Sequence, residues 1–434
     1  MNRRFYFRST PISRLLILLG FGAAISLGAC GEKLEAGSAC PILCPNPDVQ
    51  PRDTMVDGVA IDSTLAGFPA IGQENVLLLA ARGDTLDTRV IFRFDSIGKT
   101  YPHPSAPADS FVNHVDSATL RVVLDTSRLN GVPALPSAPV TVELYDVDGP
   151  ADTVAADLLP LFTPSRLLGS RTFLPDSLAK DTLFLPVSPA AVLTKIVTGA
   201  RLRIGLRLVS TASTQLRIVS SSSLGATLRF KPASDTAVNV GLLSKTPADS
   251  TLLAFRSALQ DYVITAKAAP SPPPNTISVG GFPARRTYLR FDLPSRIVDS
   301  SSVVRASLTL TQFPMRGSPS AQDSLAVYPF AVTAGTVVTD IARLMGFISV
   351  NSGLVTDSLR VVPADTGQRR LELVNIVRVW RNTNPDQTQR ALILVVGAEG
   401  RNPAEATFFS SKAASDLRPR LQLTYVPKVT LGLP

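Results

Sequence analysis

Short runs of alternating apolar and polar residues recur along most of the chain, a pattern typical of β-strands with one buried face. Residues 89–95 (RVIFRFD) and 286–292 (RTYLRFD) alternate in this way, and both end in Arg-Phe-Asp. Residues 115–125 and 302–312 also alternate and are rich in β-branched side chains. The 27 glycines and 35 prolines are spread between the runs as turn residues. The pattern therefore predicts an all-β protein.

These runs occur in the same order in two halves of the chain. The further matches are 140–147 with 323–332, 200–210 with 390–400, and 214–232 with 406–427. Five matched features in one order indicate an internal repeat, and a repeat defines the unit of folding. The pattern breaks between residues 233 and 250, so we predict two tandem domains, 53–235 and 236–434.

Two short passages carry apolar residues at helical spacing instead. The first contains Ile341, Leu344, Met345 and Ile348, and the second contains Leu373, Ile376, Val377 and Trp380. We expect both to cap an open end of the second domain.

The first 29 residues have the order of a secretory signal: a basic segment, an apolar segment (LLILLGFGAAISL) and then small residues. Leu27-Gly28-Ala29-Cys30 resembles the bacterial lipobox. That resemblance implies cleavage before Cys30, a diacylglycerol on its sulfur, and an exported, lipid-anchored protein. Gly31, rather than Asp, follows the cysteine, which favours the outer membrane. The alternative is an ordinary signal peptide with a chance cysteine.

Residues 30–52 lack periodicity and are predicted to form a lipidated tether. Cys40 and Cys44 lie within it, and outside the cytoplasm such a pair is best interpreted as a local disulfide. A metal site would need two further ligands. The chain has only two histidines, His103 and His114, far from these cysteines, so we predict no metal and no cofactor.

The repeat motifs resemble those of DNRLRE domains, a family of bacterial surface modules related to a group of carbohydrate-binding modules. In the second copy the resemblance rests on LRFDL (289–293), ASLTL (306–310), Val377 to Trp380, FSS (409–411) and PRLQLTY (419–425). In the first copy it rests on FRFD (92–95), SATLR (117–121) and ATLRF (226–230), without a tryptophan. The resemblance implies a jelly-roll-type β-sandwich in each copy. The alternation independently favours sandwiches.

The net charge of +9 raises the question of nucleic-acid binding. Four arginines lie upstream of Cys30, which leaves the mature chain at +5. Its remaining cations are scattered singly apart from pairs such as Arg285–Arg286 and Arg369–Arg370. Phosphate neutralisation needs clustered cations, so we predict no nucleic-acid partner.

The sequence offers little support for catalysis. Both histidines flank a Pro/Ser/Ala-rich insertion that the second copy lacks, which argues against a Ser-His-acid triad. Gly280-Gly281 is interpreted as a turn before a strand rather than a phosphate-binding loop. No rule selects a pair of facing carboxylates for glycoside hydrolysis. We predict that the protein is not an enzyme.

Three residues remain as ligand-binding candidates. Asp95 and Asp292 end the repeated Arg-Phe-Asp and could bind calcium or a sugar hydroxyl, but pairing with arginine beside a turn is favoured. Trp380 could stack on a sugar, but its place on an apolar helical face favours core packing. The sequence thus predicts a non-catalytic surface lipoprotein with structural or protein-contact modules. A polysaccharide-binding lipoprotein is the alternative.

Overall fold

The computed structural model describes residues 50–427 apart from internal gaps. The gaps are residues 57–58, 70, 73, 84, 96, 103–106, 128–134, 151–152, 221–223, 233–237, 244–260, 269–270, 316–322, 333–356, 383–389 and 398. The predicted signal peptide, most of the tether and the helix predicted at 341–348 lie outside the described residues.

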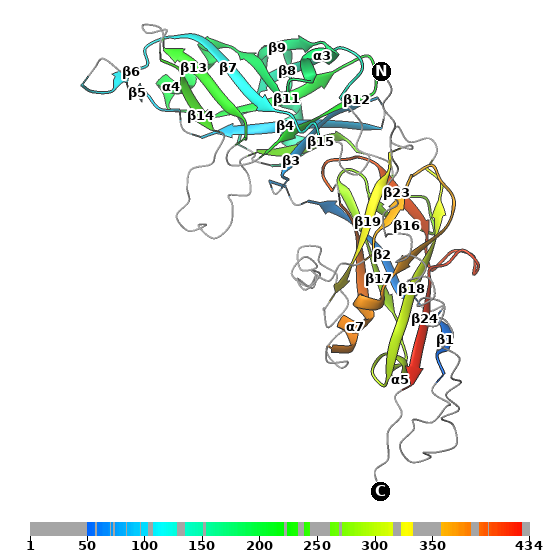
Figure 1. Cartoon of the computed structure of the whole chain (residues 1–434). Helices are drawn as coiled ribbons and strands as arrows, with labels where there is room; N and C mark the ends of the chain where they lie inside the picture. Colours follow the sequence, from blue (N-terminus) through cyan, green and yellow to red (C-terminus); the bar gives the residue numbers. More distant parts are fainter. Residues whose placement is uncertain are drawn as a thin grey trace, which may run out of the picture. The chain divides into compact units, whose positions relative to one another are not determined.

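Antiparallel strands make up most of the described chain (Figure 1). The all-β prediction is confirmed. Each run of alternating residues in the repeat forms a strand or, for the two longest, a pair of strands. Every ladder between two of the named strands is antiparallel.

The first module is formed by β3 to β15. Its strands are β3 (Val76–Arg82), β4 (Leu86–Phe94), β5 (Thr100–Tyr101), β6 (Ser110–Phe111), β7 (Val115–Val123), β8 (Val140–Asp146), β9 (Leu167–Phe173), β10 (Thr182–Val187), β11 (Leu202–Val209), β12 (Thr214–Val219), β13 (Thr227–Pro232), β14 (Val240–Leu243) and β15 (Asp261–Lys267). A seven-stranded sheet has the order β12-β3-β4-β11-β8-β9, with β15 paired to β4, and a four-stranded sheet has the order β10-β7-β13-β14. Both sheets contribute to one apolar core, including Phe92 from the first and Leu120 from the second. The first module is therefore a sandwich.

The second module is formed by β1, β2 and β16 to β24. Its strands are β1 (Arg52–Val56), β2 (Val59–Phe68), β16 (Thr276–Gly280), β17 (Ala284–Phe291), β18 (Ser301–Phe313), β19 (Leu325–Val332), β20 (Leu359–Val361), β21 (Gly367–Glu372), β22 (Ala391–Val396), β23 (Glu405–Phe409) and β24 (Arg420–Pro427). They form one 11-stranded sheet around a separate core. The sheet is continuous because β18, 13 residues long, pairs with β24 along most of its length and with β23 at its end.

Short helices lie between the strands. They are α2 (Ala155–Leu158), α3 (Pro175–Leu178), α4 (Pro189–Thr198), α5 (Ser295–Val298) and α7 (Val374–Asn382), with 3-10 turns at Leu159–Leu161 and Pro164–Arg166. Helix α4 begins where the Ser188 side chain accepts a hydrogen bond from the Ala191 N–H, and it ends at Gly199, whose φ is +67°. Helix α7 confirms the helix expected around residues 373–380, and its apolar face packs into the second core. None of the described helices is long and apolar enough to cross a membrane.

The two modules exchange strands reciprocally. β1 and β2 open the described chain, yet they pair with β24 and β17 of the second module. β14 and β15 open the second sequence repeat, yet they pair with β13 and β4 of the first module. Because β13 matches β24 and β4 matches β17 in the repeat, the exchanged strands occupy equivalent positions. Figure 1 shows β1 and β2, in blue, among the yellow-green to red strands of the second module.

The structure therefore divides the chain differently from the predicted ranges 53–235 and 236–434. Residues 76–267 hold all the strands of the first module, and residues 52–68 belong with 276–427. The repeat marks which segments are equivalent. It does not show which module an edge strand will pair with. An edge strand with the alternating pattern can pair with the equivalent strand of either module.

Candidate functional site

The repeated Arg-Phe-Asp is mainly structural in the first module. Arg93 forms an ion pair with Asp95, with Nη2 3.2 Å from Oδ1, and both side chains are about nine-tenths buried. Phe94 and Phe291 lie in the cores. The arginine therefore already occupies the carboxylate that was a candidate calcium ligand. Asp292 differs, because it is exposed just beyond the end of β17.

Trp380 lies in the second core. Its side chain is 2% exposed, its ring centroid is 6.0 Å from that of Phe291, and its Nε1–H donates to the Ala391 carbonyl at 3.1 Å. An indole in this position presents no face on which a sugar could stack.

The remaining sequence candidates are dispersed. Cys30, Cys40, Cys44 and His103 lie outside the described residues. His114 is exposed, with Nε2 3.7 Å from Oδ1 of Asp116. Gly280 and Gly281 both have positive φ in the tight connection between β16 and β17, which confirms the predicted turn. Within the described ranges, no three His, Cys, Asp or Glu side chains gather closely enough to hold a metal ion.

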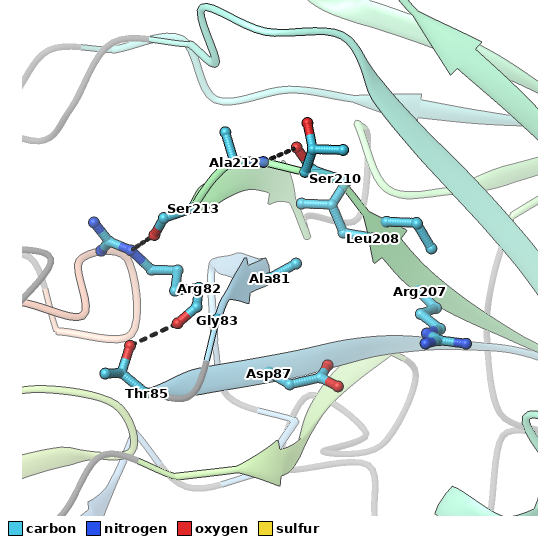
Figure 2. Close-up of a pocket in the computed structure, with 12 residues that line it drawn as sticks. Ala81, Arg82, Gly83, Thr85, Asp87, Arg207, Leu208, Ser210, Ala212 and Ser213 are labelled. Carbon is cyan, nitrogen blue, oxygen red and sulfur yellow. Dashed lines mark hydrogen bonds between the residues drawn. The ribbon is translucent and has the colours of Figure 1, made fainter.

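A pocket of about 470 Å³ opens where the β3–β4 turn meets the β11–β12 loop (Figure 2). Arg82 ends β3, Asp87 lies in β4 and Arg207 lies in β11. The hydroxyl-rich segment 210–213 forms the loop. The Arg82 guanidinium donates to Ser213 Oγ at 3.5 Å and to Gln215 Oε1 at 3.2 Å. Burial lowers the pKa of Arg82, and the Asp323 carboxylate partly opposes this shift.

The other charges lining this pocket are also paired. Arg207 is 3.7 Å from Glu143, and Asp87 is 3.3 Å from Arg89. The pocket is thus polar but close to neutral. It could accept a small hydroxyl-bearing molecule, and its lining includes no histidine, cysteine or lysine to act as base or nucleophile.

A second candidate is the outer face of the four-stranded sheet, which sequence reasoning missed. Along β7, Ala118, Leu120 and Val122 enter the core, so Thr119 and Arg121 point outward. On the outer side of the neighbouring strands lie Phe184, Arg229 and Lys231. We call Arg121, Phe184, Arg229 and Lys231 the cationic face.

The strand register brings the members of the cationic face together. Phe184 is the partner of Arg121 across β10–β7, and Arg121 is the partner of Thr227 across β7–β13. Arg229 follows Thr227 by two residues on the same side of β13, and its guanidinium carbon is 6.0 Å from the centroid of the Phe184 ring. The sequence signal was present as arginines at the polar positions of SATLR and ATLRF. Their proximity depends on the pairing of two strands about 100 residues apart.

Comparisons with known proteins add little to the fold. No protein-family model matches the chain, and no curated protein matches it. A crystal structure of a "putative secreted protein" from Parabacteroides distasonis ATCC 8503 aligns with 9% identity and a TM-score of 0.24, over 86% of this chain and 99% of that one. The VP2 subviral particle of infectious bursal disease virus aligns with 11% identity and a TM-score of 0.12, over 88% of this chain and 77% of that one.

Proposed function

We propose that the protein is a non-catalytic, exported lipoprotein, tied through Cys30 to the outer membrane, whose two modules form a structural and contact unit at the cell surface. The reciprocal strand exchange carries this proposal. The strand that follows the tether, β1, is built into the module made by the opposite end of the chain. A pull on the tether would therefore reach the second module before the first.

The register of β1 and β2 suits such a load. β1 pairs with β24 over five residues, from Arg52–Tyr425 to Val56–Leu421, and β2 pairs with β17 over most of its length. A force along these strands loads their ladder hydrogen bonds together rather than one at a time. This arrangement supports a structural role for an anchored chain.

The buried charged side chains form ion pairs with one another, which also supports a non-catalytic role. Arg217 pairs with Asp125 at 3.3 Å, and Arg286 pairs through two nitrogens with Glu399. These groups bridge neighbouring strands and loops, as structural ion pairs do, rather than converging on a pocket. Polysaccharide binding is the second candidate, and the cationic face is the observation that favours it.

Lipidation is tested by expressing the full-length chain in a diderm bacterium beside a Cys30→Ser variant. We expect wild-type protein in the outer-membrane fraction, a mature N-terminal peptide carrying acyl chains by mass spectrometry, and digestion by protease added to intact cells. The variant should be released from the membrane. Recovery of both proteins in the soluble periplasm, or wild-type protein without acyl chains, would refute the anchor.

A further inference from the structure

We propose that the cationic face of the first module binds an acidic polysaccharide, one whose sugars carry carboxylate or sulfate groups. This inference deepens the second candidate function and rests on it. It does not depend on the lipid anchor.

The cations of this face differ from most others in the described sheets. Arg89, Arg93 and Arg217 each lie within 3.3 Å of a carboxylate oxygen. Among the described residues, the side chains of Arg121 and Lys231 form no ion pair or hydrogen bond, and the Arg229 guanidinium lies over the Phe184 ring. The outward positions of β10, of β13 and of β7 from Ser117 to Val123 include no acid. The exposed Asp116, one residue before this stretch, lies 3.7 Å from His114. The face therefore presents three positive charges that the described protein does not neutralise.

The spacing of these charges suits a chain of anionic groups. Arg229 and Lys231 are two residues apart on one strand, so their Cα atoms are separated by about 7 Å. Arg121 lies diagonally across from Arg229, again at about 7 to 8 Å. Successive charged sugars of a polymer can contact the members of such a row in turn.

Phe184 supplies the other element that a sugar requires. Its side chain is 42% exposed, although it stands on a strand whose alternate residues, Leu183 and Leu185, are buried. The apolar face of a pyranose can pack on such a ring while its acidic groups meet the guanidinium of Arg229. The hydroxyls of Ser117 and Thr119, outward on β7, lie beside the cations as hydrogen-bonding groups.

The second module provides an internal comparison, because equivalent strands pair in the same register. The positions of Arg121, Arg229 and Lys231 are occupied there by Thr309, Gln422 and Thr424, respectively. The positions of Phe184 and Pro186 are occupied there by Arg370 and Glu372, and Glu372 is 3.6 Å from Arg305. That face also carries cations, but at other positions: Arg305, Arg370 and Arg420 stand where the first module has Ser117, Phe184 and Thr227. The fold thus forms this sheet without cations at the positions of Arg121, Arg229 and Lys231, so these three are not needed to build it.

Other polyanions fit the face less well. Duplex DNA is usually held by some six to ten phosphate contacts, and single strands by successive stacked aromatics, whereas this face offers three cations and one ring. An anionic membrane would be held by three cations and by insertion of Phe184, the one exposed large apolar side chain on the described face, which is a weak combination.

The test uses the full-length chain purified in detergent and labelled polygalacturonate, dextran sulfate and neutral dextran as probes. The key variant carries R121T, R229Q and K231T, which are the residues found at these positions in the second module. Arg370→Ala, at the position equivalent to Phe184, is the matched control. Binding is measured by fluorescence anisotropy at about 50 mM and about 300 mM salt, since screening weakens contacts to exposed charges.

We expect wild-type protein to bind both acidic polymers at low salt and to bind them more weakly at high salt. It should not bind neutral dextran. The triple variant should bind at least about tenfold more weakly with an unchanged unfolding midpoint, and Phe184→Ala should weaken binding about threefold to tenfold. Arg370→Ala should match wild type. Equal binding by the triple variant, or no wild-type binding to either acidic polymer, would overturn the proposal.

Two further probes test which class of ligand binds the cationic face. Tighter binding to a single-stranded oligonucleotide or to anionic phospholipid vesicles than to both acidic polymers would show that the ligand is wrongly assigned. Each measurement is repeated on Cys30→Ser protein. Because the polymer contacts do not involve the anchor, binding should be the same, so a failure of lipidation and a failure of glycan binding are told apart.

Discussion

Arg52, the first residue of β1, is the register partner of Tyr425 in β24, the last of the described strands. The two ends of the described chain therefore lie side by side in one sheet. The strand order around them shows that the folding units are not the two sequence repeats, and fragments of the chain can test this.

We expect residues 70–270, which contain β3 to β15, to fold alone with a cooperative urea transition and a near-ultraviolet dichroism signal. Residues 271–434 should fail to do so, because they lack β1 and β2 and leave the edges of β24 and β17 unpaired. Joining residues 51–68 after residue 427 by a short linker should restore folding, since Arg52 lies beside Tyr425. A cooperative transition for 271–434 alone, at the midpoint of the joined form, would contradict this division.

Glu399→Gln should lower the free energy of unfolding by about 3 kcal/mol. The change leaves the Arg286 guanidinium buried beside the Phe68 ring, 3.8 Å from its centroid, without its carboxylate partner. Asp365→Asn removes the more exposed partner of Arg369 and should cost less than about 1 kcal/mol. Urea denaturation of both variants checks the contrast, and equal losses would count against it.

Asp148 should make stability depend on acid pH. Burial favours the neutral carboxyl, but Arg201 at 2.6 Å and Lys195 at 3.3 Å outweigh it, so the pKa of Asp148 lies below its ordinary value of 3.8. A carboxyl with a lowered pKa stabilises the fold above the pKa of the unfolded chain, and this stabilisation fades as the pH falls below it.

Asp148→Asn should therefore lower the free energy of unfolding by about 1 kcal/mol near neutral pH, a value reduced by solvent screening. The difference from wild type should shrink below about pH 4. Urea titrations across this range measure it. A difference that stays constant with pH would assign the loss to packing instead.

Trp380→Phe should destabilise the protein without changing polysaccharide binding. The variant loses the hydrogen bond to the Ala391 carbonyl and part of a ring that fills the second core, at a cost of about 1 to 3 kcal/mol. Arg381→Ala, on the exposed side of α7, is the control and should have little effect. Weaker binding to polygalacturonate at unchanged stability would instead return Trp380 to the ligand-binding candidates.

The pairing of Arg93 with Asp95 could be anticipated from the sequence, because residues two apart on a strand share a face and the aspartate precedes a turn. The burial of Trp380 was also predictable from its helical spacing with Leu373 and Val377. The cationic face was not predicted. Arg121 and Arg229 appear as isolated arginines until β7 and β13 are paired.

The sequence by itself determined that the chain forms strands, where most of them lie, and which segments of its two halves are equivalent. The alternation of apolar and polar residues lies within each strand, so the sequence of a strand predicts which of its faces is buried. Only the tertiary structure decided that β2 pairs with β17 and β15 with β4, and hence where each module begins and ends. Which strand pairs with which depends on contacts between segments that are distant in the sequence. The equivalent edges of the two modules can each accept a strand with the same alternating pattern. The physical reason is that alternation specifies a face, whereas pairing depends on which edge the connecting chain can reach.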